Sequence, residues 1–178
     1  MNGPPPIILD SSVAIAIIRN EPGAAALRVA VDQWTILCRP LMVPAIFWLE
    51  VVNALARGHR YRGLDVLHAV HELDELTITT VDSDRAQVLK TIDLVERFGL
   101  TAYDASYLAV AHLYGGDIAT LDLELVRAAG ARAIVLDGRP RLSEPTAVSE
   151  HDVTWPNYKG ASAYLAKLRA EARAAGAG

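Results

Sequence analysis

Four carboxylates stand beside or within apolar segments of this 178-residue chain. They are Asp10, Glu50, Asp104 and Asp122, in the contexts ILDSSV, FWLEVV, AYDASY and ATLDLE. A buried, ionised carboxylate is costly unless a cationic group or a metal ion compensates its charge. Carboxylate oxygens are also the ligands that Mg²⁺ and Mn²⁺ prefer. These residues therefore predict an acidic pocket that binds a divalent cation.

Each acid also has an ordinary structural interpretation. Asp10 and Asp122 each follow a predicted strand and precede a helix, where an aspartate can cap the helix. Asp104 lies three residues after Thr101, in the pattern of a capping box. Glu50 is the only charged residue in segment 41–56, and its alternative role is a buried ion pair with an arginine. The sequence alone leaves these alternatives open.

The elements that must position the acids alternate between strand and helix. Apolar or β-branched runs predict strands at residues 7–10, 41–43, 77–81, 118–121 and 133–136. Periodicity and capping residues predict helices at about 11–18, 22–33, 45–57, 62–75, 83–98, 101–115 and 123–129, with Ser83 as one cap. This alternation predicts an α/β domain with a parallel sheet covered on both faces. Ligand sites in such folds lie at the carboxyl ends of the strands, where Asp10 and Asp122 fall.

The amino-acid composition indicates the type of fold and the cellular compartment to expect. The chain is 52% hydrophobic but only 6% aromatic, which favours closely packed helices over an aromatic-rich β sandwich. Its one cysteine, Cys38, excludes an intrachain disulfide and suits a reducing cytoplasm. The longest apolar run, 41–49, contains Pro44 and is too short to span a bilayer. With no recognisable secretory signal, we expect a soluble cytoplasmic protein without a membrane partner.

Charge is distributed unevenly along the chain. Its net charge is −4, yet segment 139–178 holds six Lys and Arg against four acids, so the rest carries −6. An acidic core is unusual for a nucleic-acid binder, and a bound divalent cation would partly offset it. The same segment carries three prolines, followed by apolar residues at helical spacing: Ala161, Leu165, Leu168 and Ala172. We therefore expect a core domain at 1–138 and a proline-bearing arm with a C-terminal helix at 139–178.

The order of the acids resembles a known family. LDSS, FWLEVVNAL, TAYDASYLAVA and ATLD together resemble PIN-domain ribonucleases, above all the VapC-like toxins of bacterial type II toxin–antitoxin systems. The resemblance covers about residues 7–136 and implies a PIN-like three-layer fold. It also implies that four acids hold Mg²⁺ or Mn²⁺ and act in catalysis: Asp10, Glu50, Asp104 and Asp122. Thr120 is implied as a further catalytic residue.

The resemblance implies an activity and partners as well. The expected activity is metal-dependent endoribonucleolytic cleavage of single-stranded or loop RNA, commonly transfer or ribosomal RNA. A cognate antitoxin protein and a homodimer are the expected assemblies. Two alternatives stay open: a structure-specific DNA nuclease, which shares the same metal chemistry, and a non-catalytic PIN-like binding module, which would be expected to lack some of the acids.

Candidate substrate contacts surround the motif RGHRYR at residues 57–62. Basic groups can hold phosphates, and Tyr61 could stack an unpaired base. An ordinary exposed turn is the alternative interpretation. Asn53 and Arg57 share the helical face of Glu50. The candidate substrate-binding residues are Ser11, Asn53, Arg57, Arg60 and Arg62.

Other chemistries lack support. A phospho-acceptor receiver domain needs an adjacent acid pair near the first strand and a late lysine, but no lysine occurs between Lys90 and Lys159. Phosphatases with an Asp-x-Asp motif are excluded because Ser11 and Ser12 follow Asp10. The chain has no P-loop and no GxSxG motif.

Overall fold

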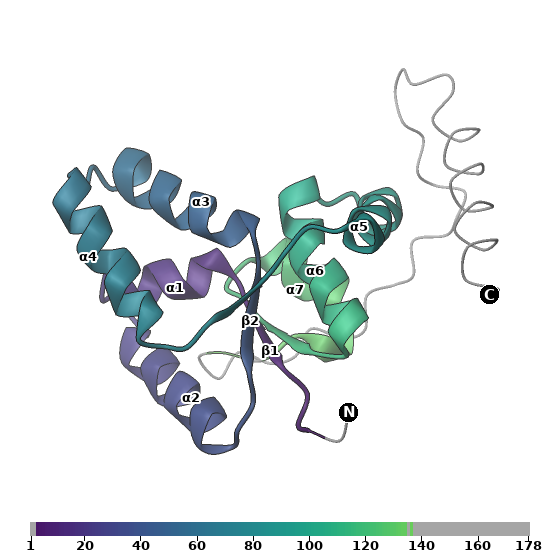
Figure 1. Cartoon of the computed structure of the whole chain (residues 1–178), viewed down its shortest axis with the longest axis horizontal. Coiled ribbons are helices and arrows are strands. Elements are labelled where there is room, and N and C mark those ends of the chain that lie inside the picture. Colours follow the sequence, from purple (N-terminus) through teal and green to yellow (C-terminus); the bar gives the residue numbers. More distant parts are fainter. Residues whose placement is uncertain (1–2, 135, 137–178) are drawn as a thin grey trace. The chain divides into compact units, whose positions relative to one another are not determined.

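A four-stranded, wholly parallel sheet forms the centre of the structure, a computed structural model that describes residues 3–134 and 136 (Figure 1). The strand order is β3-β2-β1-β4, so β1 and β2 lie inside the sheet. In register, Ile8 of β1 stands between Met42 of β2 and Ile118 of β4. The strands are β1 (Ile7–Leu9), β2 (Leu41–Pro44), β3 (Thr79–Val81) and β4 (Asp117–Ala119).

Helices cover both faces of this sheet. Helices α1 to α4 lie on one side and α5 to α7 on the other (Figure 1), and α6 packs across β1, β2 and β4. This arrangement confirms the expected three-layer α/β fold. The helices are α1 (Ser11–Ile18), α2 (Ala24–Ile36), α3 (Ile46–Asn53), α4 (Gly63–Asp74), α5 (Arg85–Phe98), α6 (Ala102–Tyr114) and α7 (Leu123–Ala129), with a π-helical turn η1 (Ala54–Gly58) and a 3₁₀ turn η2 (Gly130–Arg132).

Strand β1 and helix α6 form the middle of the core. All three residues of β1 are fully buried, because helices cover both faces of a parallel sheet. In α6, Ala105, Ala109 and Ala111 are fully buried together with Tyr107 and Leu108. The small alanine side chains suit a helix that packs closely on the sheet, and this helix carries Asp104 in its first turn.

Capping residues define where α5 and α6 begin. The Asp84 side chain accepts a hydrogen bond from the Gln87 backbone N–H at 2.8 Å, so the prediction that Ser83 caps this helix was wrong. The two neighbours are equally suited by type, and only the backbone path selects between them. The Thr101 hydroxyl accepts from the Asp104 backbone N–H at 3.1 Å, which confirms the predicted cap of α6.

Several predicted elements differ in extent, three of them in ways that bear on the fold or the site. Helix α2 runs to Ile36, three residues past its predicted end. The predicted helix at 45–57 changes at Ala54 into the π-helical turn η1. The predicted strand at 133–136 contributes, within the described residues, one parallel bridge between Ala133 and Ile118.

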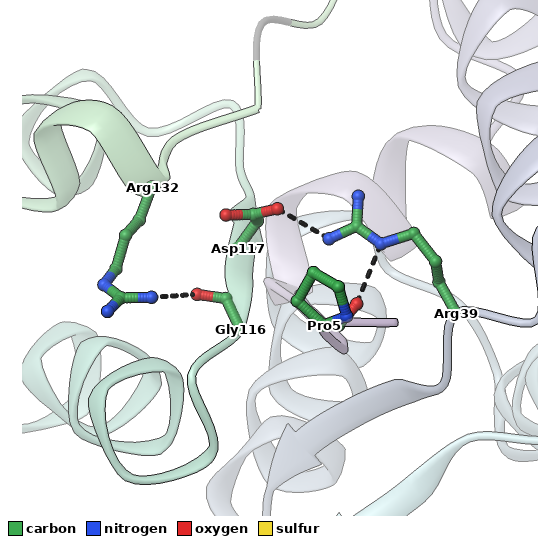
Figure 2. A network of polar contacts seen from close by, with 5 residues as sticks. All are labelled: Pro5, Arg39, Gly116, Asp117 and Arg132. Atoms are coloured by element: carbon green, nitrogen blue, oxygen red, sulfur yellow. Dashed lines mark hydrogen bonds and ion pairs between the residues drawn. The ribbon is translucent and has the colours of Figure 1, made fainter. Parts of the chain in front are cut away.

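A polar network closes the amino end of the sheet, where β1 and β4 begin (Figure 2). The Arg39 guanidinium pairs with Asp117 through Nη2 and Oδ2 at 2.6 Å, and its Nε donates to the Pro5 carbonyl at 2.8 Å. Arg132 donates from Nη1 to the Gly116 carbonyl at 3.0 Å. We call these five residues the amino-end network; it connects the segments that lead into β1, β2 and β4.

Two expectations concern membranes and the C-terminal segment. None of the described helices is both long and apolar enough to cross a membrane. The predicted division at residue 138 and the predicted helix with Leu165 and Leu168 lie outside the described residues. They remain predictions.

Candidate active site

Asp10 lies directly after β1, at the carboxyl end of the sheet, and is only 5% exposed. It occupies the N-cap position of α1, yet its side chain makes no capping bond to that helix. Instead its Oδ2 accepts hydrogen bonds from two hydroxyls, Ser12 Oγ and Thr120 Oγ1, the latter at 2.7 Å. The carboxylate also accepts a hydrogen bond from the Ser11 backbone N–H, so it contacts both the start of α1 and Thr120 after β4.

Thr120 joins Asp10 to the loop that follows β4. Its side chain is buried, and its hydroxyl also accepts a hydrogen bond from the Asp122 backbone N–H at 2.9 Å. Ser12 makes a similar link, since its Oγ accepts from the Leu121 backbone N–H at 3.0 Å. The two hydroxyls thus connect the ends of β1 and β4, which are neighbours in the sheet.

Glu50 reaches the same region from α3, and it is half-buried. Its Oε2 accepts a hydrogen bond from the Tyr107 hydroxyl, and the Ser11 hydroxyl also hydrogen-bonds to this carboxyl group. Among the described residues no arginine or lysine pairs with Glu50. The ion-pair alternative for Glu50 therefore finds no support in the described part of the chain.

Asp104 lies in the first turn of α6 and is half-buried. Its Oδ2 accepts a hydrogen bond from the Thr101 hydroxyl at 2.6 Å, while Thr101 accepts from the Asp104 backbone N–H. The sequence offered capping and site membership as alternatives for Asp104. The capping threonine also orients the carboxylate, so capping does not exclude site membership, which stays a prediction.

Three of the acids influence one another electrostatically. Burial raises the pKa of Asp10 above its ordinary value, and the charge of Asp104 adds to the rise. Burial likewise raises the pKa of Glu50, and the charges of Asp10 and Asp104 add to it. Both carboxyl groups are thus costly to ionise without a cation. A cation beside these carboxylates would lower the electrostatic cost of holding three negative charges close together.

Asp122 takes a different position. It is exposed, and its Oδ1 accepts from the backbone N–H groups of Glu124 at 2.7 Å and Leu125 at 2.9 Å, so it caps α7. Its own backbone N–H is bonded to Thr120, which contacts Asp10. The backbone of Asp122 is therefore linked to Asp10 through Thr120, while Oδ1 of its carboxylate caps α7.

The donor set suits a hard, partly hydrated cation. All candidate ligands are oxygen atoms, and Mg²⁺ commonly binds through only one or two carboxylates while keeping several waters. Within the described residues, no group of three or more His, Cys, Asp or Glu side chains lies close enough together to hold a metal ion by itself. The fit is therefore to an ion whose coordination shell is completed by water or substrate oxygens.

The candidate substrate residues are spread along the segment after α3. Asn53, Arg57, Arg60 and Arg62 are exposed, and no hydrogen bond or ion pair joins them to the acids in the part of the chain described. Arg57 lies in the π-helical turn, which alters the face that it would share with Glu50 in a regular helix. Ser11, in contrast, lies beside the Glu50 carboxyl group.

Tyr61 is only partly exposed. Its side chain is partly buried and packs against the hydrophobic core. The suggestion that Tyr61 stacks an unpaired base is therefore not supported by its position.

Sequence reasoning missed two residues of the pocket, Tyr107 and Ser12. Tyr107 appeared only as part of the motif TAYDASYLAVA, and Ser12 only as a residue that follows Asp10. A usable signal existed for Tyr107: it lies one helical turn after Asp104 and carries the hydroxyl on an otherwise apolar, buried segment.

Known structures with this fold include toxins. The chain is similar to a structure described as a toxin–antitoxin complex from Klebsiella pneumoniae, with 19% identity, a TM-score of 0.52, and coverage of 65% of this chain and 86% of that one. It is also similar to Mycobacterium tuberculosis VapC20, described as a toxin that cleaves the sarcin–ricin loop, with 14% identity, a TM-score of 0.54, and coverage of 67% and 92%.

A Pyrobaculum aerophilum protein gives a TM-score of 0.53 at 22% identity, covering 73% of this chain and 90% of that one. At such identities these likenesses establish the fold alone. A search of curated proteins finds no match. The PIN domain family matches residues 7–131, which is most of the chain and includes all four acids. The chain therefore belongs to the PIN-domain family, as its motifs indicated.

Proposed function

We propose that this chain is a metal-dependent endoribonuclease that acts as the toxin of a toxin–antitoxin pair. The observation that carries the proposal is the convergence of Asp10, Glu50 and Asp104 without a basic partner among the described residues. PIN domains are nucleases, and PIN-domain nucleases generally depend on divalent metal ions. Both statements agree with an acidic pocket made of oxygen donors.

Asp10, Glu50 and Asp104 are the residues proposed to hold Mg²⁺ or Mn²⁺, with Asp122 as a more peripheral fourth acid. When bound, such an ion neutralises phosphate charge and lowers the pKa of a coordinated water. The chain's own contribution is orientation. Ser12 and Thr120 hold the Asp10 carboxylate, and Thr101 holds that of Asp104. We propose that Thr120 acts through this contact in catalysis.

We propose single-stranded or loop RNA, from transfer or ribosomal RNA, as the substrate. The neighbour described as cleaving the sarcin–ricin loop supports an RNA loop as the target. Arg57, Arg60 and Arg62 are exposed along one short segment and are suited to phosphate contacts. Asn53 lies on the same helix as Glu50, and the Ser11 side chain hydrogen-bonds to Glu50. We propose that both residues contact the substrate as well.

The proposed partners are an antitoxin protein and a second copy of this chain, all in the cytoplasm. The neighbour described as a toxin–antitoxin complex supports the first of these. The electrostatics of the pocket suggest how inhibition could work. An antitoxin arginine can pair with two carboxylate oxygens at once and thereby displace the cation.

The decisive experiment is cleavage of a cellular RNA pool by the purified chain, with the new ends mapped. We expect cleavage at discrete positions in loops with Mn²⁺ or Mg²⁺, and none in chelator. Asp104→Asn should reduce the rate about 100-fold or more, because it removes a ligand while keeping the size of the side chain. Asp32→Asn is a matched control, since Asp32 is an exposed carboxylate on α2.

The same assay separates the alternatives. Preferred cleavage of branched or hairpin DNA would favour a structure-specific DNA nuclease. RNA binding without cleavage under any metal condition would favour a non-catalytic PIN-like binding module. Full activity in chelator, or equal activity of the Asp104→Asn and Asp32→Asn variants, would refute the metal-dependent site.

A further inference from the structure

Tyr107 is a fully buried tyrosine in the middle of α6, and its hydroxyl donates to Oε2 of Glu50. The two residues are 57 positions apart and belong to different helices, α6 and α3. A buried phenol needs an acceptor, and a backbone carbonyl would satisfy that need as well as a carboxylate. This phenol instead donates to an acid of the candidate metal site.

The donor is neutral, and this matters for the charge of the site. A lysine or arginine in the same position would orient Glu50 but would also cancel the charge that attracts a cation. A phenol orients the carboxylate and leaves its negative charge in place. A phenol is protonated at neutral pH, so this hydroxyl acts as the donor and the carboxylate as the acceptor.

Helix α6 supplies two groups to the pocket, one turn apart. Asp104 provides a carboxylate directly, and Tyr107 provides the hydroxyl that holds a second carboxylate from α3. The ring of Tyr107 is fixed by the core around it, because the residue has no exposed surface. A donor on so rigid a support can determine where the longer and more flexible Glu50 side chain lies.

We propose that Tyr107 is a positioning residue that fixes the Glu50 carboxylate for cation binding beside Asp10 and Asp104. The inference rests on the proposed function, since it concerns the same pocket. It assigns to Tyr107 no contact with substrate. Groups that orient metal ligands in this way typically change metal affinity 10- to 100-fold when they are removed.

The test is a double-mutant cycle that reads Mn²⁺ affinity of the full chain by titration calorimetry. The variants are Tyr107→Phe, Glu50→Gln and the combination. Tyr107→Phe keeps the ring that fills the core and removes only the hydroxyl. We expect it to weaken Mn²⁺ binding about 10-fold, and to have no further effect when Glu50 is already glutamine.

A matched control removes a hydroxyl elsewhere on the same helix. Tyr114 ends α6 and is 45% exposed, so Tyr114→Phe should leave Mn²⁺ affinity unchanged. If Glu50→Gln binds too weakly for calorimetry, the rise in melting temperature at millimolar Mn²⁺ gives the same comparison. Circular dichroism establishes that each variant is folded.

The outcomes are distinct. Unchanged Mn²⁺ affinity in folded Tyr107→Phe, or an equal loss in both Glu50 backgrounds, would overturn the positioning role even if the wild-type chain cleaves RNA. Mn²⁺ binding with the expected coupling but without RNA cleavage would keep the inference and refute the proposed function. If the wild-type chain binds no Mn²⁺, both are wrong.

Discussion

The two ends of the same sheet handle charge in opposite ways. At the amino end, Arg39 pairs with Asp117 at 2.6 Å, and Arg132 donates to the Gly116 carbonyl. At the carboxyl end, Asp10, Glu50 and Asp104 converge with hydroxyl partners but without a basic residue, as far as the chain is described. At the amino end, opposite charges are paired, which stabilises the fold. At the carboxyl end, negative charges lie close together, which does not favour folding.

Strand β4 connects these two regions. It begins with the paired Asp117, and Thr120, which contacts Asp10, follows directly after it. The difference teaches that burial alone does not identify a functional acid. What distinguishes the carboxyl end is buried acid without a cationic partner, and this arrangement predicts opposite responses to the same substitution at the two ends.

The largest expected effect comes from exchanging aspartate for asparagine at each end. Asp10→Asn should reduce metal-dependent cleavage about 100-fold or more, while the metal-free protein melts at the same temperature or higher, because a costly buried charge is gone. Asp117→Asn should keep cleavage but lose about 1–2 kcal/mol of stability, because it weakens the bond to Arg39. Cleavage rates and thermal melts in chelator measure both responses.

A reversal of this pattern would remove the contrast between the two ends. If Asp10→Asn strongly destabilised the metal-free fold, Asp10 would be a structural group like Asp117. If Asp117→Asn abolished cleavage in a folded protein, the amino-end network would belong to the function.

The next largest effect concerns packing at the amino end. A Cβ on Gly116 would lie 2.8 Å from the Pro6 carbonyl oxygen, a backbone atom that cannot easily move. Gly116→Ala should therefore cost about 1–3 kcal/mol, typical of an overpacked site. Gly63→Ala is the control, because a Cβ there meets nothing within 4 Å. Urea unfolding measures the difference, and equal stability of the two variants would contradict the tight approach.

The smallest expected effect is on the pH dependence of stability without metal. The pKa of Asp10 is raised in the folded state, so the folded protein binds more protons than the unfolded chain above pH of about 4. Asp10 therefore destabilises the metal-free fold increasingly as pH rises from that value through its raised pKa. Compared with Asp10→Asn, the wild type should lose stability over this window.

Chemical unfolding in chelator at several pH values tests this. Taking the difference between wild type and variant removes the contribution of other groups, such as His112, whose pKa burial lowers. A difference that stays constant across the window would show that Asp10 is not strained by its surroundings.

Much of the fold followed from local patterns. Apolar runs and periodicity located the four strands and seven α-helices of the described residues to within a few positions. The starts of α5, α6 and α7 were also marked by side chains that cap them. The acids were identified because charge within apolar segments is rare. In the structure Asp10 is buried and the charge of Asp104 acts on it, but the role of both acids in a site stays a prediction.

What could not be predicted depends on contacts across the fold. The spacing of Tyr107 from Asp104 places it on the same helical face, but it does not identify its acceptor, which lies 57 residues away. The π-helical turn after Asn53 has no clear sequence signature, yet it changes the direction in which Arg57 points relative to Glu50. The motif around Tyr61 suggested an exposed ring, whereas the ring is partly buried against the core, a contact that the local sequence does not indicate.

The hydroxyls of Ser12 and Thr120 have a consequence for individual protons. Each accepts a backbone N–H, from Leu121 and Asp122 respectively, and each has a single proton to give. Both protons are directed to the same atom, Oδ2 of Asp10. An oxygen that already receives two protons is a poor place for a third. Through these two hydroxyls, the backbone of the loop after β4 makes the two oxygens of the Asp10 carboxylate unequal as acceptors.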